Sequence, residues 1–372
     1  MIELAIYLAF MGTLLWWIIV LAPWQPWKTR ESLEPTHNAG VSLNDVTVLI
    51  PARNEGPFIE QTLNALSMQG LNSHIIVIDD QSNDDTAKQA QNLGAVVISG
   101  TAPPVGWSGR LWALEQGLSK VHTPYTLLLD ADITLTPGIV AALLKKAREE
   151  NLALVSLMAE PPLHNFLERL LMPAFIFFFK LLYPFQLANK PESRAAAGGC
   201  ILVETRTLQT VGAFANLHDA LIDDCALASH VKHSGLRTWI GLSHSARIHR
   251  GYDDLSTIWN LVARTAYTQL HYSPFLLFVC TLMMVSMFWF APLIPLISPF
   301  TVMVIVPGIL TWIAMTIIYS PISRYYHCSA FWVLALPVVI GTLFLLMTWT
   351  SAFRYWRGER AQWKNRRYEI SA

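Results

Sequence analysis

Residues 125–132 read YTLLLDAD, an apolar run that ends in two aspartates separated by one residue. A run of this length predicts a short buried strand at Tyr125–Leu129. Carboxylates placed just beyond such a strand can bind a hard divalent cation, and such a cation commonly also holds phosphate oxygens of a substrate. Alternatively, Asp130 and Asp132 cap a turn, which the threonine, proline and glycine that follow would suit. An isolated Asp-x-Asp is a weak indication, so its meaning depends on the surrounding sequence.

Upstream of this stretch, predicted strands and helices alternate along the chain. This alternation predicts an α/β fold with a parallel sheet, in which ligands bind at the carboxyl ends of the strands. Asp79 and Asp80 close one predicted strand as Asp130 and Asp132 close another, so we expect these carboxylates to face one crevice. The predicted elements are strand 46–50, helix 58–67, strand 74–78, helix 84–91 and strand 96–98.

The composition of the whole chain is typical of a membrane protein. Of its 372 residues, 53% are hydrophobic and 14% are charged, whereas an average soluble domain has about 25% charged residues. The 26 basic and 26 acidic residues balance, so the chain lacks the overall positive charge that nucleic-acid binding requires. We therefore expect no nucleic acid among its partners. Between about Asn44 and Tyr272 the composition is that of a water-soluble domain, and we expect the chemistry there.

The apolar residues are concentrated toward the two ends of the sequence. Residues 4–22 carry no charge, and this run has about the ~20 residues that a helix needs to cross a bilayer. We therefore predict a transmembrane helix within residues 1–25. A cleaved signal peptide is the alternative, but the sequence has neither a basic start before the apolar run nor a small-residue cleavage site after it.

A second apolar region, residues 275–350, predicts two or three further transmembrane helices. We expect spans at 275–297, 301–319 and 330–350. Residues 351–372 form a basic tail, and the positive-inside rule places this tail in the cytoplasm together with the segment that follows the first helix.

These two placements conflict, because one helix before a cytoplasmic middle region and three after it would leave the tail outside. We interpret one piece of a Pro-rich stretch as re-entrant or interfacial, since broken helices are tolerated where protein buries them. The alternatives are an external tail, or a tail that rests on the membrane as an amphipathic end. The prolines concerned are Pro292, Pro295, Pro299 and Pro307.

Residues 170–185 form a shorter apolar segment inside the middle region. This segment is too short and too interrupted to span a bilayer. We expect an interfacial helix, which could bring the active site down to a lipid hydroxyl in the headgroup region. A core helix under the sheet is the alternative.

Three stretches of the middle region read VLIPARNE at 48–55, IIVIDDQSNDDT at 75–86 and LLDAD at 128–132. Together they strongly resemble the family 2 glycosyltransferases with a GT-A fold, over roughly residues 44–270. The flanking helices resemble those of membrane-bound members that glycosylate lipids, such as ceramide glucosyltransferase. Residues 106–114, GWSGRLWAL, are similar to the hopanoid-biosynthesis-associated glycosyltransferases. The resemblance implies a GT-A type, Rossmann-like mixed α/β sheet flanked by transmembrane α-helices.

The resemblance also implies a nucleotide-sugar donor, which we expect to be a UDP-sugar. Asp130 and Asp132 would hold Mg²⁺ or Mn²⁺ against the diphosphate, where the ion neutralises charge on the leaving UDP. The loop after the first strand and the acids that end the second would surround uracil and ribose, since a carboxylate accepts hydrogen bonds from uracil N3–H or ribose hydroxyls. The residues implied on this side are Pro51, Arg53, Asn54, Glu55, Asp79 and Asp80.

The family takes the proton of the acceptor hydroxyl with an acidic pair further along the chain, which corresponds here to Asp223 and Asp224. We expect Asp224 to be the base and Asp223 its neighbour. A partly desolvated carboxylate close to another acid has its pKa raised toward neutrality, which suits proton abstraction. The alternative is a helix N-terminus in which both acids merely favour the helix dipole.

Two arginines are further candidates for contact with the donor. Processive and glycolipid-making relatives carry Gln-x-x-Arg-Trp after the base, and residues 260–265 read NLVART, so Arg264 is kept while Gln and Trp are missing. Arg264 could still contact the pyrophosphate or the sugar, but the missing Trp puts acceptor stacking there in doubt. Arg110 stands where many relatives have Lys, as a second phosphate contact or as the exposed start of helix 111–118.

Other residues have two open interpretations. Residues 197–200, with Arg206 and residues 211–214, resemble the acceptor-side loop and the turn before the base. Their glycines either let the backbone approach the sugar closely or belong to turns without ligand contact. His244 and residues 249–251 are either phosphate or metal ligands or structural residues.

The function that the resemblance implies is inverting transfer of a sugar from a nucleotide sugar to a membrane lipid, by a single in-line displacement. We expect a multi-pass protein of the inner membrane whose catalytic domain faces the cytoplasm, with a hopanoid or another polycyclic lipid as acceptor. A polyprenyl-phosphate or polysaccharide glycosyltransferase is the second possibility. The third is a non-catalytic membrane scaffold that retains a nucleotide-binding fold.

Overall fold

The computed structural model describes residues 2–35, 42–71, 74–191, 198–297, 302–359, 362–363 and 366–367. The chain divides into two compact units. The sheet unit comprises Glu31–Pro162, Phe185–Gly251 and Arg360–Ala372, and the helical unit comprises Met1–Arg30, Leu163–Pro184 and Tyr252–Glu359.

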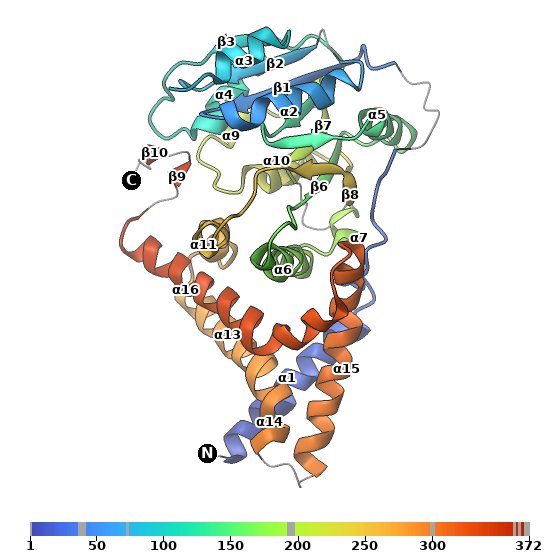
Figure 1. Cartoon of the computed structure of the whole chain (residues 1–372), viewed down its shortest axis with the longest axis vertical. Helices are drawn as coiled ribbons and strands as arrows, with labels where there is room; N and C mark the ends of the chain where they lie inside the picture. Colours follow the sequence, from blue (N-terminus) through green and yellow to red (C-terminus); the bar gives the residue numbers. More distant parts are fainter. Residues whose placement is uncertain are drawn as a thin grey trace. The chain divides into compact units, whose positions relative to one another are not determined.

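The sheet unit contains an eight-stranded sheet with the strand order β3-β2-β1-β4-β7-β6-β8-β5 (Figure 1). Its first four strands are parallel, whereas β7 runs antiparallel to both β4 and β6, and β5 runs antiparallel to β8. The predicted mixed α/β sheet is therefore confirmed. The strands are β1 (Val46–Ala52), β2 (Ile75–Asp79), β3 (Val96–Ser99), β4 (Tyr125–Leu129), β5 (Ile133–Leu135), β6 (Leu154–Glu160), β7 (Cys200–Glu204) and β8 (Thr238–Ile248).

Helices cover both faces of this sheet, which explains why all seven residues of β1 are buried. Side chains alternate between the two faces of a strand. Val48 and Ile50 accordingly pack with α2 and α5 in one core, whereas Leu49 packs with α4 and α10 in the other. The helices of the unit are α2 (Gly56–Ser67), α3 (Thr86–Asn92), α4 (Gly109–Leu118), α5 (Ile139–Glu149), α7 (Phe185–Ala188), α8 (Thr205–Thr210), α9 (Ala213–Asn216) and α10 (Asp223–His233). A two-stranded sheet pairs β9 (Gln362–Trp363) with β10 (Arg366–Arg367).

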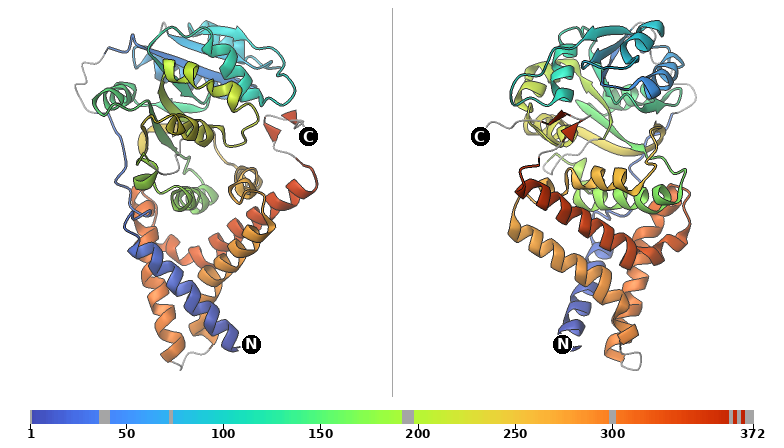
Figure 2. Two further views of the ribbon diagram at one scale, coloured as in Figure 1. Left: turned by 180° about the vertical axis from the view of Figure 1, so that it is seen from behind. Right: turned by 60° about the vertical axis from the view of Figure 1, so that its left-hand side comes forward.

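The helical unit contains four stretches long and apolar enough to cross a membrane: Glu3–Leu21, Pro274–Leu296, Val302–Tyr325 and Ala330–Trp356. Helices α1 and α15 lie side by side (Figures 1 and 2). The elements are α1 (Ile2–Leu21), α6 (Phe166–Leu182), α11 (Leu255–Ala263), α12 (Ala266–Gln269), α13 (Pro274–Val285), η1 (Ser286–Phe290), α14 (Ala291–Ile297), α15 (Val302–Tyr325), η2 (Ala330–Ala335), η3 (Leu336–Gly341) and α16 (Thr342–Trp356).

The Pro-rich stretch was expected to contain a re-entrant or interfacial piece, and the structure differs from this expectation. Pro295 lies inside α14 and Pro307 inside α15, and both helices belong to stretches long enough to span a bilayer. The π-helical turn η1 precedes α14, and local π adjustments of this kind satisfy backbone groups that a proline leaves free. Pro299 lies outside the described residues. The irregular segment comes later, where the 3₁₀ turns of η2 lead into the π-helical η3.

Helix α6, which covers most of the predicted interfacial segment, belongs to the helical unit. It begins with a capping box, in which the Asn165 side chain accepts from the Glu168 N–H and the Glu168 carboxylate accepts from the Asn165 N–H. The Phe177 ring lies 5.5 Å from the Tyr319 ring of α15, and the Phe178 ring lies 4.6 Å from the Phe344 ring of α16. These contacts attach α6 to the apolar helices; its place at the membrane surface stays a prediction.

Candidate active site

Asp130 and Asp132 lie between β4 and β5, at the edge of the sheet where the parallel strands β1, β2 and β4 end. The backbone around them is tightly placed: the Asp130 N–H donates to the Gly199 carbonyl (3.3 Å), and the Asp132 carbonyl accepts from the His249 N–H (2.9 Å). A Cβ added at Gly199 would lie 2.9 Å from Oδ2 of Asp130. Glycine is therefore needed there so that β7 can begin directly against this carboxylate.

Arg110 joins the aspartates after β4 to the acidic start of α10. It stands in the first turn of α4, which Ser108 caps. Its Nη2 donates to Oδ1 of Asp130 (2.7 Å), and its Nη1 donates to Oδ2 of Asp223. The Arg110 side chain is only 18% exposed, so it is not a solvated helix start. Although burial opposes its charge, Asp130 and Asp223 raise the pKa of Arg110, which keeps it positive.

Asp223 and Asp224 are the first two residues of α10, and Oδ1 of Asp224 accepts from the Cys225 N–H (3.0 Å). Burial and the neighbouring Asp223 raise the pKa of Asp224 to about 7, against the opposing charge of Arg110. The helix-terminus interpretation therefore describes where the pair lies, but it leaves the raised pKa unexplained. A carboxylate that changes its protonation state near neutrality suits general-base work.

Asp130 and Asp132 fit a divalent cation that a substrate helps to hold. Burial raises the pKa of Asp130, Arg110 opposes this, and Asp132 raises it further, so a cation beside both carboxylates would relieve their repulsion. Among the described residues, no group of three or more His, Cys, Asp or Glu side chains could hold a metal ion. Mg²⁺ is usually bound through one or two carboxylates plus substrate phosphates, and two aspartates match that pattern.

Hydrogen bonds join the loop after β1 to the loop after β2. The Arg53 guanidinium donates to the Asp80 carbonyl (2.5 Å) and lies 3.8 Å from its carboxylate, which is almost fully buried. Asn54 has a left-handed backbone (φ +51°), its N–H donates to Oγ of Ser82 (2.9 Å), and its Oδ1 accepts from the Asn83 N–H (2.8 Å). These contacts form a fixed edge next to the aspartates.

The other two residues predicted for this edge differ in exposure. Pro51 lies within β1, where it is buried and paired with Ile78 of β2. Asp79 ends β2 and is half-buried, and its Oδ1 accepts weakly from the Ser82 N–H (3.4 Å). Asp79 and Asn54 are thus the more accessible polar groups of this edge.

Arg250 is a part of the site that the sequence left open between a ligand-binding and a structural role. It follows β8, and its Nε donates to Oδ2 of Asp132 (2.7 Å), while its Nη2 donates to Oε2 of Glu55. Its guanidinium also lies over the Phe58 ring, 4.1 Å from the centroid. The sequence placed Arg250 in a group with two open interpretations, and the antiparallel pairing of β8 with β5, in which Ile248 lies opposite Ile133, brings it to Asp132.

Several other predicted residues have surroundings of their own. Arg264 is exposed at the C-terminal end of α11, in the helical unit, and its role stays a prediction. Nδ1 of His244 lies 3.1 Å from the Glu160 carboxylate, which favours a structural role. A Cβ added at Gly198 would lie 2.6 Å from the carbonyl oxygen of Leu157, so glycine permits close strand packing there. Ala197 lies outside the described residues.

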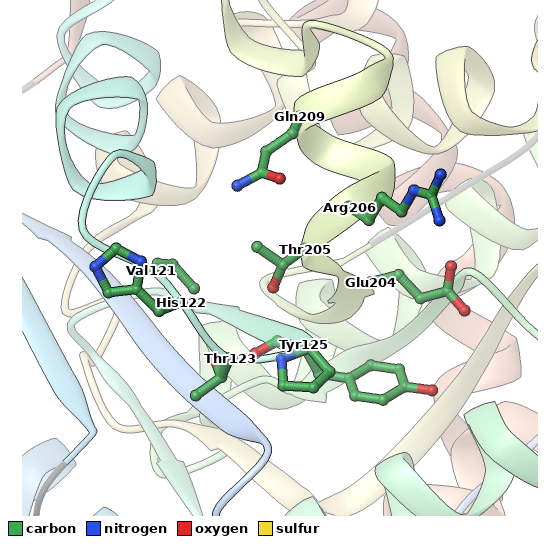
Figure 3. Close-up of a pocket in the computed structure, with 9 residues that line it drawn as sticks. Val121, His122, Thr123, Tyr125, Glu204, Thr205, Arg206 and Gln209 are labelled. Carbon is green, nitrogen blue, oxygen red and sulfur yellow. Dashed lines mark hydrogen bonds between the residues drawn. The ribbon is translucent and has the colours of Figure 1, made fainter.

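A pocket of about 510 Å³ lies near Tyr125, Glu204 and Arg206 (Figure 3). Tyr125 begins the five-residue strand β4, whereas Asp130 follows its last residue, so the two lie about 17 Å apart along the strand. This pocket therefore lies at the opposite edge of the sheet and is distinct from the carboxylate cluster.

Comparison with known proteins gives local sequence matches. A family model described as "Glycosyl transferase family 2" matches residues 47–200. The 4,4'-diaponeurosporenoate glycosyltransferase of Staphylococcus haemolyticus (strain JCSC1435) is 34% identical over 122 residues, which cover 32% of this chain and 32% of that protein. The protein of the same name from Staphylococcus aureus (strain USA300) is 36% identical over 90 residues, or 24% of each chain. The chain thus matches a third or less of the length of these relatives.

A solved structure matches over nearly the whole chain. The mannosyltransferase PcManGT from Pyrobaculum calidifontis, in complex with GDP-Man and Mn²⁺, superposes with a TM-score of 0.56 at 15% identity and covers 96% of this chain and 99% of that one. At this identity the likeness shows a shared fold. The expected GT-A fold class is therefore confirmed, and residues 47–200 match the model of glycosyltransferase family 2.

Proposed function

We propose that this chain is a membrane-bound inverting glycosyltransferase. It moves a sugar from a nucleotide-sugar donor, expected to be a UDP-sugar, to a lipid of the inner membrane at the cytoplasmic face. The family match over residues 47–200 and the four apolar helices support this proposal.

The observation that carries the proposal is the Arg110 bridge. One guanidinium contacts Asp130, the proposed metal residue, and Asp223, the neighbour of the proposed base. The diphosphate of a donor must lie beside the metal residues, and the acceptor hydroxyl must lie beside the base. A guanidinium shared by these two carboxylates supports the proposal that both halves of one reaction take place there.

In the proposed reaction, Asp224 takes the proton of the acceptor hydroxyl. The acceptor oxygen forms the new bond to the anomeric carbon as the bond between that carbon and the diphosphate breaks, and the electron pair leaves with the nucleotide. Attack from the side opposite the leaving group inverts the anomeric centre. Asp130 and Asp132 would hold Mg²⁺ or Mn²⁺, which neutralises charge on the leaving diphosphate. Arg110 holds the carboxylates of Asp130 and Asp223 in place.

The fixed loops after β1 and β2 support a nucleotide site beside these acids. Asn54 and Asp79 are accessible there, whereas Asp80 is buried and paired with Arg53, so we propose that Asp80 orients the loop. Arg264 is proposed to reach the pyrophosphate or the sugar, since a guanidinium suits phosphate oxygens.

The identity of the acceptor is the most specific part of the proposal. The resemblance of residues 106–114 favours a hopanoid or another polycyclic lipid, while the curated relatives are named for 4,4'-diaponeurosporenoate. Both choices are membrane lipids. A polyprenyl phosphate or a growing polysaccharide is a less favoured acceptor, because the Gln-x-x-Arg-Trp motif is incomplete at residues 260–265.

The test uses the purified full chain in detergent with UDP-sugars and GDP-mannose, Mn²⁺ or Mg²⁺, and lipid extracts that contain hopanoids or diaponeurosporenoate. We expect nucleotide release together with a labelled lipid, and loss of both after exhaustive chelation. The absence of transfer from every donor, despite nucleotide binding, would favour a scaffold that has kept the fold.

A further inference from the structure

The Glu55 carboxylate faces an arginine of its own chain. Glu55 is buried, with 6% exposure, and its Oε2 accepts from Nη2 of Arg250. The same guanidinium donates from Nε to Oδ2 of Asp132 (2.7 Å). The Glu55 and Asp132 carboxylates are therefore linked through one side chain, although 76 residues and several strands separate them along the sequence.

Besides the two carboxylates, Arg250 contacts an aromatic ring. Its guanidinium lies over the face of the Phe58 ring, a contact that stabilises a cation there. Arginine stays protonated in proteins, so Arg250 presents a positive charge to both carboxylates. A planar guanidinium that is fixed by two carboxylates and a ring has one orientation, and it fixes the orientation of Asp132 in turn.

We propose that Arg250 is a positioning residue for the metal carboxylate Asp132, and that Glu55 acts through Arg250 instead of touching the nucleotide. This inference rests on the proposed function, because it assigns Asp132 to the divalent cation. The guanidinium engages Oδ2 of Asp132 and so fixes the plane of the carboxylate that would hold the cation. Partners behind a metal ligand typically change metal affinity or activity about 10- to 100-fold when they are removed.

The test compares Mn²⁺ binding to the full-length detergent-solubilised protein by electron paramagnetic resonance, with UDP present, in the wild type and in Arg250→Gln. We expect Arg250→Gln to bind Mn²⁺ about 10- to 100-fold more weakly, with a matching rise in the KM for Mn²⁺ and a smaller change in kcat. Arg250→Lys should recover part of the affinity, since lysine keeps the charge but loses the two-pronged geometry. Arg247→Gln, an exposed arginine of β8 paired with Glu160, is the matched control.

Glu55 provides the second arm of the experiment. If Glu55 acts through Arg250, Glu55→Gln weakens Mn²⁺ binding, leaves UDP binding without metal unchanged, and adds little to Arg250→Gln in the double variant. Additive effects, or a loss of UDP binding without metal in Glu55→Gln alone, would overturn the inference. Wild-type Mn²⁺ affinity in a folded Arg250→Gln protein would also overturn it and leave the proposed function intact. A wild type that binds no Mn²⁺ with either UDP or GDP would overturn both.

Discussion

At the scale of single residues, the proposed chemistry depends on the protonation of Asp224. We expect Asp224→Asn to lower the transfer rate about 10²- to 10⁴-fold, which is the usual contribution of a general base. Nucleotide and Mn²⁺ binding should survive, because the Arg110 bridge contacts Asp223 and Asp130 instead of Asp224. Single-turnover transfer together with UDP binding measures the two effects separately.

Asp219→Asn is the matched control for this variant. Asp219 is an exposed aspartate in the loop before α10, so its loss removes the same charge without changing the cluster. A folded Asp224→Asn protein that transfers sugar at the wild-type rate would exclude Asp224 as the base.

The raised pKa of Asp224 gives a second residue-scale prediction. Burial and Asp223 raise this pKa to about 7, and a base works only when it is deprotonated. We therefore expect kcat/KM to fall about tenfold for each pH unit below about 7 and to level off above it. Arg110 lowers the pKa of Asp224, so Arg110→Gln should move the midpoint of the profile to higher pH. A profile of wild-type and variant from pH 5 to 9 checks the direction; a shift to lower pH would contradict it.

The sequence predicted the carboxylates of the site better than the arginines that hold them. Asp130 and Asp132 follow a strand whose apolar run is visible in the sequence, so their place at the edge of the sheet could be predicted. The partner of Asp132 could not be predicted, because Arg250 follows β8. This strand reaches the site by pairing with β5, some 115 residues earlier in the sequence, and with β6, some 80 residues earlier. No local pattern records such a pairing.

At the scale of elements, the start of β7 determines how the Asp130 carboxylate is placed. A Cβ at Gly199 would lie 2.9 Å from Oδ2 of Asp130 and 2.7 Å from Cδ1 of Ile133, and both distances force a shift. We expect Gly199→Ala to raise the KM for Mn²⁺ about tenfold, measured as Mn²⁺-dependent transfer. Gly94→Ala, which strains a left-handed backbone (φ +84°) with no atom nearby, controls for a general loss of stability. Unchanged Mn²⁺ dependence in Gly199→Ala would argue against Asp130 as a metal ligand.

Helix α6 gives a prediction about stability in the helical unit. The buried Glu168 carboxylate accepts from the N–H groups of His164 (2.7 Å), Asn165 (3.1 Å) and Tyr252 (2.7 Å). Glu168→Ala would leave these donors without their acceptor, at a cost of about 1–3 kcal/mol each where they stay buried. We expect a clearly lower Tm in detergent, whereas Glu149→Ala, which removes an exposed carboxylate, should leave the Tm nearly unchanged. Equal Tm values for the two variants would contradict this account of the capping box.

Elements with a clear local pattern were predictable and the others were not. The strand predicted at Tyr125–Leu129 agrees with β4 at both ends, and helix 58–67 begins only two residues late. Strands β5 to β8 were not predicted, because periodicity in short apolar runs does not separate strand from helix. Their antiparallel and long-range pairings depend on the sheet that the earlier strands have formed.

At the scale of the whole molecule, the main question is how often the chain crosses the bilayer. The number of crossings depends on whether the segment Ala330–Trp356 of the helical unit spans the bilayer. Helix α16 has 15 residues and a length of about 22 Å, which is short of the ~30 Å hydrocarbon core. Before α16 the segment bends, and Gly341 lies directly against Phe288 of η1, part-way along the α13–α14 stretch. Ala330–Trp356 therefore contacts the α13–α14 stretch at η1.

The two ends of this bent segment contact α6 and its neighbour α12. At its far end, the Tyr355 ring stacks on the Tyr272 ring at 4.4 Å, and Oγ of Ser351 accepts from the Tyr267 N–H (3.0 Å). At its near end, the Trp332 ring lies 5.3 Å from the Phe166 ring of α6. Helix α6 is seen end-on in Figure 1, where α1 and α15 run lengthwise, and its other end reaches α12. The segment thus enters and leaves on one side.

This geometry predicts three crossings and one re-entrant segment, which removes the conflict between the positive-inside rule and a simple count of helices. The basic tail and the catalytic region then share the cytoplasmic side. Reporter fusions after residues 272, 328 and 372 test this in a bacterial host. We expect a cytoplasm-active fluorescent reporter to be active, and a phosphatase that needs export to be inactive, at all three points. If Ala330–Trp356 crosses the bilayer, the fusion after residue 372 will report the opposite side from the fusion after residue 328.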